Sequence, residues 1–278
     1  MRFVVLTLFY AFILCFLACD TLFYYPRKDP SKKPVPTRQR ELLIESQSGN
    51  KLHTFVFEPE ESKAVVLFFH GNARNVTYLY RTFYFIYESG YTYIAFDYSG
   101  YGKSEGSPSR DSLYFDGIAL LEYANQISKE KNLPLIVIGQ SLGGAVLAGS
   151  LKGFKDLGNI DLIHFDCTFP SYREVADYHG KKYTLLPIGS LLITDTHDPQ
   201  LTYPKLKESQ VLVSHCRQDK TVPYYLGEKI YSMIPSVKKE FWSFDCKHSA
   251  AFWKEPNRNK LLEYYDQISL KSKVTDNY

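Results

Sequence analysis

Short apolar runs separated by longer amphipathic stretches dominate the chain from about residue 41 onward. The runs 42–45 and 53–57 flank the turn-forming residues Ser48-Gly49-Asn50, so they predict an antiparallel hairpin. Residues 65–69 are continuously apolar, which is typical of a strand buried on both faces of a sheet. Further strands are predicted at 93–96, 135–138, 162–165, 211–213 and 241–244.

Helix-length segments lie between these strands, at 76–88, 109–129, 142–151, 224–234 and 250–270. Strands that alternate with helices of this length predict an α/β fold, in which helices cover both faces of a mostly parallel sheet. The predicted strands belong to one domain over residues 41–270, which a C-terminal tail over 271–278 follows.

The first forty residues have a different character. Arg2 precedes an apolar stretch over residues 3–18, which is short for a membrane span and suits the apolar region of a secretory signal. Phe16-Leu17-Ala18-Cys19 resembles a bacterial lipobox, although Phe16 stands where Leu is usual. We therefore expect a signal peptide over 1–18, a lipidated Cys19 and a polar, Pro-rich tether over 19–40. Such a protein would be a membrane-anchored lipoprotein of the bacterial cell envelope, facing the periplasm.

An uncleaved N-terminal anchor is the alternative interpretation. Four basic residues follow the apolar stretch, whereas Arg2 alone precedes it. If the stretch were retained as a span, this charge distribution would place the domain in the cytoplasm. The four residues are Arg27, Lys28, Lys32 and Lys33.

Composition limits the function classes only broadly. The 278 residues are 45% hydrophobic, which is enough for one sizeable core. A formal net charge of +3 gives no reason to expect a nucleic-acid partner. None of the five cysteines forms a C-x-x-C pair and no H-E-x-x-H occurs, so the sequence indicates neither a zinc site nor a dithiol redox site.

A candidate nucleophile lies in Gly139-Gln140-Ser141-Leu142-Gly143, between the predicted strand 135–138 and the predicted helix 142–151. A G-x-S-x-G motif on a strand-to-helix turn exposes its serine at the edge of the sheet. The turn is so tight that a Cβ two positions before or after the serine would crowd it. The hydroxyl of Ser141 then lies beside a helix N-terminus, whose backbone N–H groups can bind an oxyanion.

A second oxyanion donor is expected from His70-Gly71-Asn72-Ala73, which directly follows the predicted strand 65–69. The backbone N–H of Asn72 would act together with that of Leu142. The alternative is that His70-Gly71 is simply a turn.

The chain order nucleophile, acid, base that accompanies this motif selects the other two residues. His248 is the last of the seven histidines and follows the predicted strand 241–244, so it is the candidate base. Asp219 lies on the loop after the strand 211–213 and is the favoured acid, because a carboxylate there can orient the imidazole. Asp166, at the end of the preceding strand, is the alternative acid.

Taken together, these motifs resemble those of the α/β-hydrolase superfamily over nearly the whole of residues 41–270. The resemblance is to the branch that includes protein depalmitoylases and membrane-tethered bacterial hydrolases. It implies an eight-stranded sheet with little or no lid, and acyl-enzyme chemistry without a metal or organic cofactor. The matching segments are residues 70–73, 96–106 and 139–144, the Asp219 loop that ends in Val222-Pro223, and His248.

Two cysteines depart from the pattern of this superfamily. Cys216 stands where a glycine usually follows the histidine of the acid loop, and Cys246 stands two residues before the base, where glycine is also usual. Both would end neighbouring strands. We therefore hypothesise a Cys216–Cys246 disulfide, which an exported location would permit; two small buried thiols are the alternative.

The expected function is hydrolysis of a carboxylic ester or thioester, in a small molecule or an acylated partner, by a monomer held at a membrane. An acyltransferase that uses the same three residues is one alternative. A catalytically inactive, membrane-bound binding protein is another.

Overall fold

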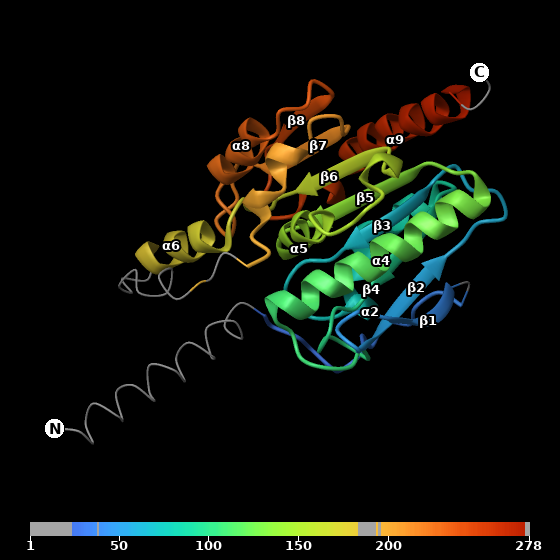
Figure 1. Ribbon diagram of the computed structural model, residues 1–278, viewed down its shortest axis with the longest axis horizontal. Coiled ribbons are helices and arrows are strands. Elements are labelled where there is room, and N and C mark those ends of the chain that lie inside the picture. The colour runs from blue at the N-terminus through green and yellow to red at the C-terminus, as the bar shows by residue number, and fades with distance from the viewer. Residues whose placement is uncertain (1–23, 38, 183–192, 194–195, 276–278) are drawn as a thin grey trace.

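A single eight-stranded sheet forms the centre of the protein (Figure 1). The computed structural model describes residues 24–37, 39–182, 193 and 196–275 of the chain. Within them the strand order is β1-β2-β4-β3-β5-β6-β7-β8; β2 pairs antiparallel with β1 and β4, and the other pairs are parallel. This arrangement confirms the predicted α/β class and the mostly parallel sheet. The strands are Gln39–Glu45, Lys51–Phe57, Val65–Phe69, Thr92–Phe96, Leu135–Gln140, Leu162–Asp166, Val211–Cys216 and Lys239–Phe244.

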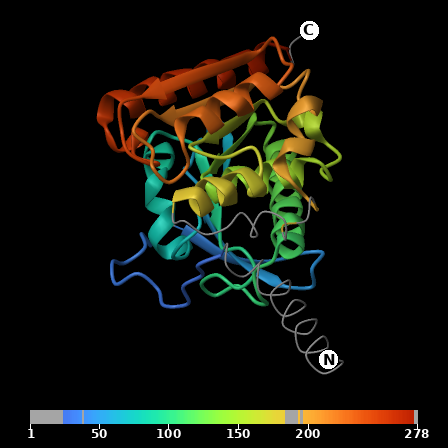
Figure 2. The same ribbon diagram turned by 90° about the vertical axis from the view of Figure 1, so that its left-hand side faces the viewer.

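Side chains of the central strands point alternately into two apolar layers, because successive strand residues face opposite sides of a sheet. In β3, Val65, Leu67 and Phe69 enter one layer, whereas Val66 and Phe68 enter the other. Residues of α4, α5 and α8 line the first layer, and residues of α2, α3 and α9 line the second. Figure 2 shows α2–α3 and α4 on opposite sides of the strands. The helices are Val76–Leu79, Tyr84–Glu88, Arg110–Lys131, Leu142–Leu151, Tyr224–Met233 and Glu255–Thr275.

The long helix α4 has clear signals at both ends. Ser109 accepts a hydrogen bond from the backbone N–H of Ser112, whose side chain in turn accepts from the backbone N–H of Ser109. Asn132 ends the helix in the left-handed region, at φ 51° and ψ 52°. These caps explain why the prediction of 109–129 came within two residues of the observed ends.

The helix predicted over 76–88 is instead broken into α2, the 3-10 turn η2 (Tyr80–Thr82) and α3. Phe83 lies at the break with φ −124°, outside the helical region. Its ring is fully buried and contacts Phe68 edge-on at 5.0 Å between centroids. Burial of this ring against the sheet outweighs the continuous helical pattern. The helix predicted from residue 250 begins at Glu255, after the 3-10 turn η6 (Ala251–Trp253).

The connection from β6 to β7 contains the helix α6 (Tyr172–Lys182) and the 3-10 turns η4 (Pro199–Leu201) and η5 (Tyr203–Lys205). Tyr203 and Leu206 are fully buried in the same apolar layer as α4 and α5. The part of this connection that the structure describes therefore packs onto the core at both of its ends.

Residues 24–34, expected as part of a tether, are docked on the domain instead (Figure 2). We call them the N-terminal strap. Tyr24 is buried, and backbone groups of the strap are hydrogen bonded to the loop that follows β3. The predicted signal peptide and Cys19 lie outside the described residues. No helix within the described ranges has the length and apolar character needed to cross a membrane.

A buried polar network crosses the sheet below the carboxyl ends of β5, β6 and β7. Ser214 Oγ donates to Asp166 Oδ1 at 2.6 Å, and His164 bonds Ser214 Oγ through Nε2 at 2.8 Å and Tyr265 Oη through Nδ1 at 3.0 Å. Because Ser214 uses its proton on Asp166, we assign the His164 proton to Nε2. Burial lowers the pKa of His164 to about 3, so this imidazole is neutral in the folded protein.

The neutral state of His164 predicts a pH-dependent loss of stability. Below a pH of about 6.5 the unfolded chain binds a proton on His164, whereas the folded protein does so only near pH 3, so stability falls as the pH falls through this window. At pH 5 the loss relative to pH 7 should be about 2 kcal/mol greater in the wild type than in His164→Gln. Urea unfolding at both pH values measures it; identical pH slopes in the two proteins would contradict the assignment.

Candidate active site

Ser141 occupies the turn between β5 and α5, at the carboxyl edge of the sheet. Strand order reverses beside β5, and such a switch point is where open α/β sheets bind ligands. The backbone of Ser141 has φ 56° and ψ −124°, a conformation that a residue with a side chain rarely adopts. Strain of this kind typically costs roughly 1–3 kcal/mol and persists only where the surroundings enforce it.

Packing around the turn enforces this conformation. A Cβ at Gly139 would collide with the backbone of Gly143 and Gly144, and a Cβ at Gly143 would collide with the backbone carbonyls at the end of β3. Thr168 Oγ1 donates to the carbonyl of Ser141 at 2.6 Å from the other side. The glycines of the motif are therefore required by contact, as the sequence predicted.

His248 connects the predicted nucleophile to the predicted acid. Its Nε2 lies 2.9 Å from Ser141 Oγ, and its Nδ1 lies 2.6 Å from Asp219 Oδ2. The arrangement fits an imidazole that donates from Nδ1 and accepts the serine proton at Nε2; this tautomer is assigned from the hydrogen bonds. The side chain of His248 is 23% exposed while that of Asp219 is fully buried, so the imidazole faces the solvent side of the site.

The carboxylate of Asp219 is held in place from two directions. Oδ1 accepts the backbone N–H groups of Thr221 and Val222, both at 2.8 Å. His215 Nε2 lies 3.6 Å from Oδ2 and donates to the carbonyl of Val222 at 2.9 Å. Burial, as the dominant effect, lowers the pKa of His215. His215 was set aside as a base on chain order, and the sequence carried no further signal of its place beside the acid.

Asp166, the alternative acid, has hydrogen bonds to other residues and none to His248. Its two carboxylate oxygens bind Ser214 Oγ and the side-chain amide of Gln140, at 2.6 and 2.8 Å. Burial raises the pKa of Asp166. Of the two candidate acids, Asp219 is therefore the one that is hydrogen bonded to the imidazole of His248. Asp166 belongs to the buried polar network below the site.

Of the two predicted oxyanion donors, Asn72 lies on the loop after β3 and Leu142 at the start of α5. A Cβ added to Gly71 would lie 3.5 Å from Ser141 Cβ, so the loop after β3 touches the serine turn. Tyr98 Oη donates to the carbonyl of His70 at 2.9 Å and fixes the start of this loop. Leu142 is the first residue of α5, and the first amides of a helix have no acceptor within it.

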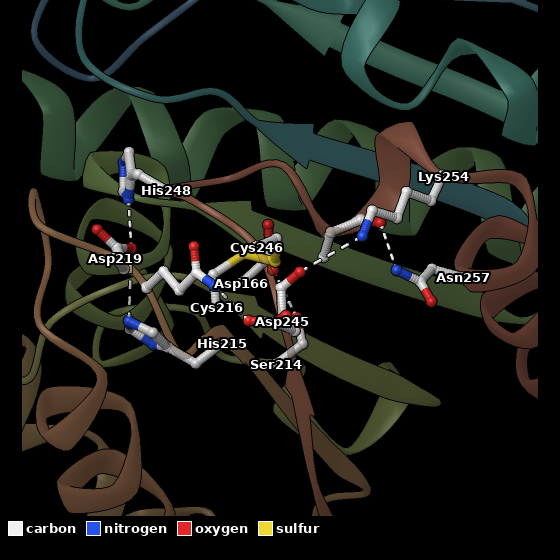
Figure 3. The surroundings of a disulfide bond; sticks show 12 residues. Asp166, Ser214, His215, Cys216, Asp219, Asp245, Cys246, His248, Lys254 and Asn257 are labelled. Carbon is white, nitrogen blue, oxygen red and sulfur yellow. Dashed lines mark hydrogen bonds and ion pairs between the residues drawn. A yellow bond between two sulfur atoms is a disulfide. The ribbon is translucent and has the colours of Figure 1, made fainter.

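A disulfide joins Cys216, the last residue of β7, to Cys246 on the loop after β8, with 5.0 Å between the Cα atoms. Cys216 comes three residues before Asp219, and Cys246 two residues before His248. Figure 3 shows the bridge beside Asp219, which His248 and His215 approach from opposite sides. The disulfide therefore links the loop of the acid to the loop of the base. Cys167 is buried and unpaired.

One group in the described ranges has the residue types of a metal site. The ligand atoms of Cys167, His215 and Asp219 lie within 4.8 Å of one another. Both oxygens of Asp219 already accept hydrogen bonds, and His215 Nε2 is used on a carbonyl. These hydrogen bonds explain why the side chains lie so close together: they support the carboxylate of Asp219.

A groove of about 610 Å³ lies over the helices α2, α3 and α9, and Ser141, His248 and Asp219 are not among its lining residues. Its lining includes Arg74, two residues beyond Asn72, and Phe252 and Trp253, which follow His248 by four and five residues. Side chains of α2, η2, α3 and α9 complete it. Its lining is aromatic with three arginines and a single carboxylate, Glu88.

The parallel sheet, the serine turn and the order of the motifs define an α/β-hydrolase. The chain has the α/β-hydrolase fold, and the structure-based and sequence-based comparisons agree on this class. The family model described as serine aminopeptidase, S33, matches residues 60–156.

Three individual proteins show how far the similarity extends, but none of them establishes an activity for this chain. The uncharacterized protein YfhR of Salmonella typhi is 29% identical over 243 residues, which are 83% of this chain and 81% of that protein. The lysophosphatidylserine lipase ABHD12 of Danio rerio is 29% identical over 64% of this chain, but over only 49% of its own length. The esterase Pf2001 of Pyrococcus furiosus has a TM-score of 0.69 at 19% identity, covering 87% of this chain and 96% of the esterase, and so shares the fold.

The disulfide predicts a redox-dependent stability. Reduction should lower the free energy of unfolding by about 3.6 kcal/mol, since the bond closes a loop of 30 residues in the unfolded chain. Urea unfolding with and without a reductant measures the difference. The double variant Cys216→Ala/Cys246→Ala, which retains Cys167, should be insensitive to the reductant. A wild type that is equally insensitive would show that the two cysteines are not bonded.

Proposed function

We propose that the protein is a serine hydrolase that cleaves carboxylic esters or thioesters through an acyl-enzyme, with Ser141, His248 and Asp219 as nucleophile, base and acid. The observation that carries this proposal is the chain of two hydrogen bonds from Ser141 Oγ through His248 to Asp219, at 2.9 and 2.6 Å. It reproduces the geometry in which an imidazole can take the serine proton while a buried carboxylate stabilises the resulting imidazolium.

In the first step, Ser141 Oγ attacks the substrate carbonyl and its proton moves to His248 Nε2. The negative charge that develops on the carbonyl oxygen is stabilised by the backbone N–H groups of Asn72 and Leu142. The tetrahedral intermediate collapses when His248 Nε2 returns the proton to the leaving alcohol or thiol. The products of this step are the free leaving group and an ester of the acyl group with Ser141.

In the second step, His248 takes a proton from water, whose oxygen attacks the acyl-enzyme. The same two amides stabilise the second oxyanion. Collapse releases the carboxylic acid and returns the proton from His248 to Ser141 Oγ. Asp219 remains ionised throughout and orients the ring, because its other oxygen is fixed by two backbone amides.

The proposed substrates are amphiphilic acyl compounds at a membrane surface. The aromatic groove, whose lining includes Arg74 and Phe252 from the segments that follow Asn72 and His248, suits an apolar chain, and its arginines suit a polar or anionic end. The names of two related proteins, a lysophosphatidylserine lipase and an esterase, support ester bonds as the class. The apolar stretch 3–18 with Cys19 supplies the proposed attachment, to the bacterial cell envelope as a lipoprotein or through an uncleaved anchor.

Removal of the nucleophile tests the proposal directly. Ser141→Ala should abolish both hydrolysis of p-nitrophenyl esters and covalent labelling by a fluorophosphonate probe. The fully buried Ser150 of α5, changed to Ala, is a matched control that should keep both. Labelling that persists in Ser141→Ala would mean that another serine is the nucleophile.

The choice of acid is tested by a pair of equal substitutions. Asp219→Asn should lower kcat by about 10⁴, because an amide favours the wrong imidazole tautomer. Asp166→Asn should lower kcat by less than about tenfold, because Asp166 is hydrogen bonded to Gln140 and Ser214 and not to His248. Steady-state kinetics on one soluble ester compares them. The reverse order of effects would make Asp166 the acid.

A further inference from the structure

The N-terminal strap contacts the loop that carries one of the proposed oxyanion donors. The backbone N–H of Tyr25 donates to Asn72 Oδ1 at 2.9 Å, and Tyr101 Oη donates to the same oxygen at 2.9 Å. The side chain of Asn72 is thus held between the strap and the loop after β4. Since the side chain is fixed, the backbone of Asn72 is fixed with it.

At Arg74, two residues after Asn72, the same loop has an unfavourable backbone conformation. Arg74 has φ 73°, which lies in the left-handed region although its side chain is long. The strap pairs with this residue: Pro26 forms a parallel bridge with Arg74, and the N–H of Arg27 donates to the Arg74 carbonyl at 3.2 Å. The strap therefore stabilises a conformation that the loop would otherwise leave.

The end of the loop is attached to the strap as well. Asn75 Nδ2 donates to the carbonyls of Arg27 and Asp29, at 2.8 and 2.9 Å, while Asn75 Oδ1 caps α2 by accepting the N–H of Thr77 at 3.1 Å. One side chain thus holds both the strap and the first turn of the helix. Asn72, Arg74 and Asn75 are all bound within a stretch of four residues.

The strap also spans the loop after β4. Gly102 N–H donates to the Arg27 carbonyl at 3.1 Å, and Lys28 Nζ donates to the Ser104 carbonyl at 2.9 Å. Further along, Arg81 Nη2 donates to the Pro34 carbonyl at 2.9 Å. The strap is consequently fixed to several elements and can act as a rigid support.

We propose that the N-terminal strap is a positioning element of the active site, which holds the Asn72 backbone N–H at the distance needed for the oxyanion. The proposal rests on the proposed function, because it assigns a role in the same reaction. No strap residue has to touch the substrate. An oxyanion donor acts only within about 2.7–3.1 Å of the developing charge, and a displacement of about 1 Å can cost up to 10² in rate.

Two substitutions at one exposed residue test the hydrogen bond from the backbone N–H of Tyr25 to Asn72 Oδ1. The side chain of Tyr25 is 64% exposed, so its loss removes little packing. Tyr25→Pro removes both the ring and the backbone N–H that Asn72 accepts, whereas Tyr25→Ala removes the ring alone. On a short, soluble ester, Tyr25→Pro should lower kcat by about tenfold, and Tyr25→Ala should stay within about threefold of the wild type.

A second variant detaches the loop at its other end without uncapping the helix. Asn75→Asp keeps an oxygen for the N–H of Thr77 but replaces the amide that donates to two strap carbonyls. Combined with Tyr25→Pro, it should lower kcat by 30- to 100-fold with KM changed by less than threefold. Thermal unfolding of the full-length proteins identifies any loss that comes from a general failure to fold.

Affinity for a trifluoromethyl ketone, which forms an oxyanion on the active serine, separates positioning from other effects. The inhibition constant should rise in proportion to the fall in kcat/KM, because both depend on the oxyanion donors. A double variant that keeps kcat/KM within threefold of the wild type, or that loses activity with an unchanged inhibition constant, overturns the strap proposal. Ser141→Ala in the same assay distinguishes this outcome, because retained activity there overturns the proposed function itself.

Discussion

The backbone of Ser141 can hold a positive φ only because glycines on both sides let β3, β5 and α5 approach within contact. This contact has two consequences. It raises the serine hydroxyl above the sheet, and it places the loop after β3 against the same turn. The loops after β7 and β8 reach the site because parallel strands end at one edge. Everything else in the site is arranged around this one strained residue.

The proposed acid and the proposed base are held in place by different contacts. Asp219 depends on local backbone amides, whereas His248 lies on a loop of its own, and hydrogen bonds between backbone groups of the two loops hold them together. The Cys216–Cys246 bond is the covalent counterpart of those contacts. Below them, Asp166 and the neutral His164 are both hydrogen bonded to Ser214, so the polar groups of this buried network are paired.

Sequence reasoning was effective where a local pattern determines the structure. Buried apolar runs located the strands, and G-x-S-x-G with its flanking elements located the turn of Ser141. The predictions failed where contacts between residues far apart in the sequence determine the structure. The break at Phe83 follows from packing against Phe68, which no local pattern contains. The strap binds largely through backbone groups and has the polar, Pro-rich composition of a linker, so nothing in its residue types distinguished it from one. The place of Asp219 at His248 was predicted, but its support by His215 was not.

The docked strap changes how far the domain can move from its proposed attachment. A free tether over residues 19–40 would let the domain explore an average separation of about 26 Å from the attachment, with full extension near 75 Å. With residues 24–34 bound to the domain, residues 19–23 alone remain between Cys19 and the docked chain, and they reach at most about 17 Å. A lipid on Cys19 would then limit the distance between the membrane surface and the domain. Acyl groups close to the membrane surface would be within its range, and those carried far above it would not.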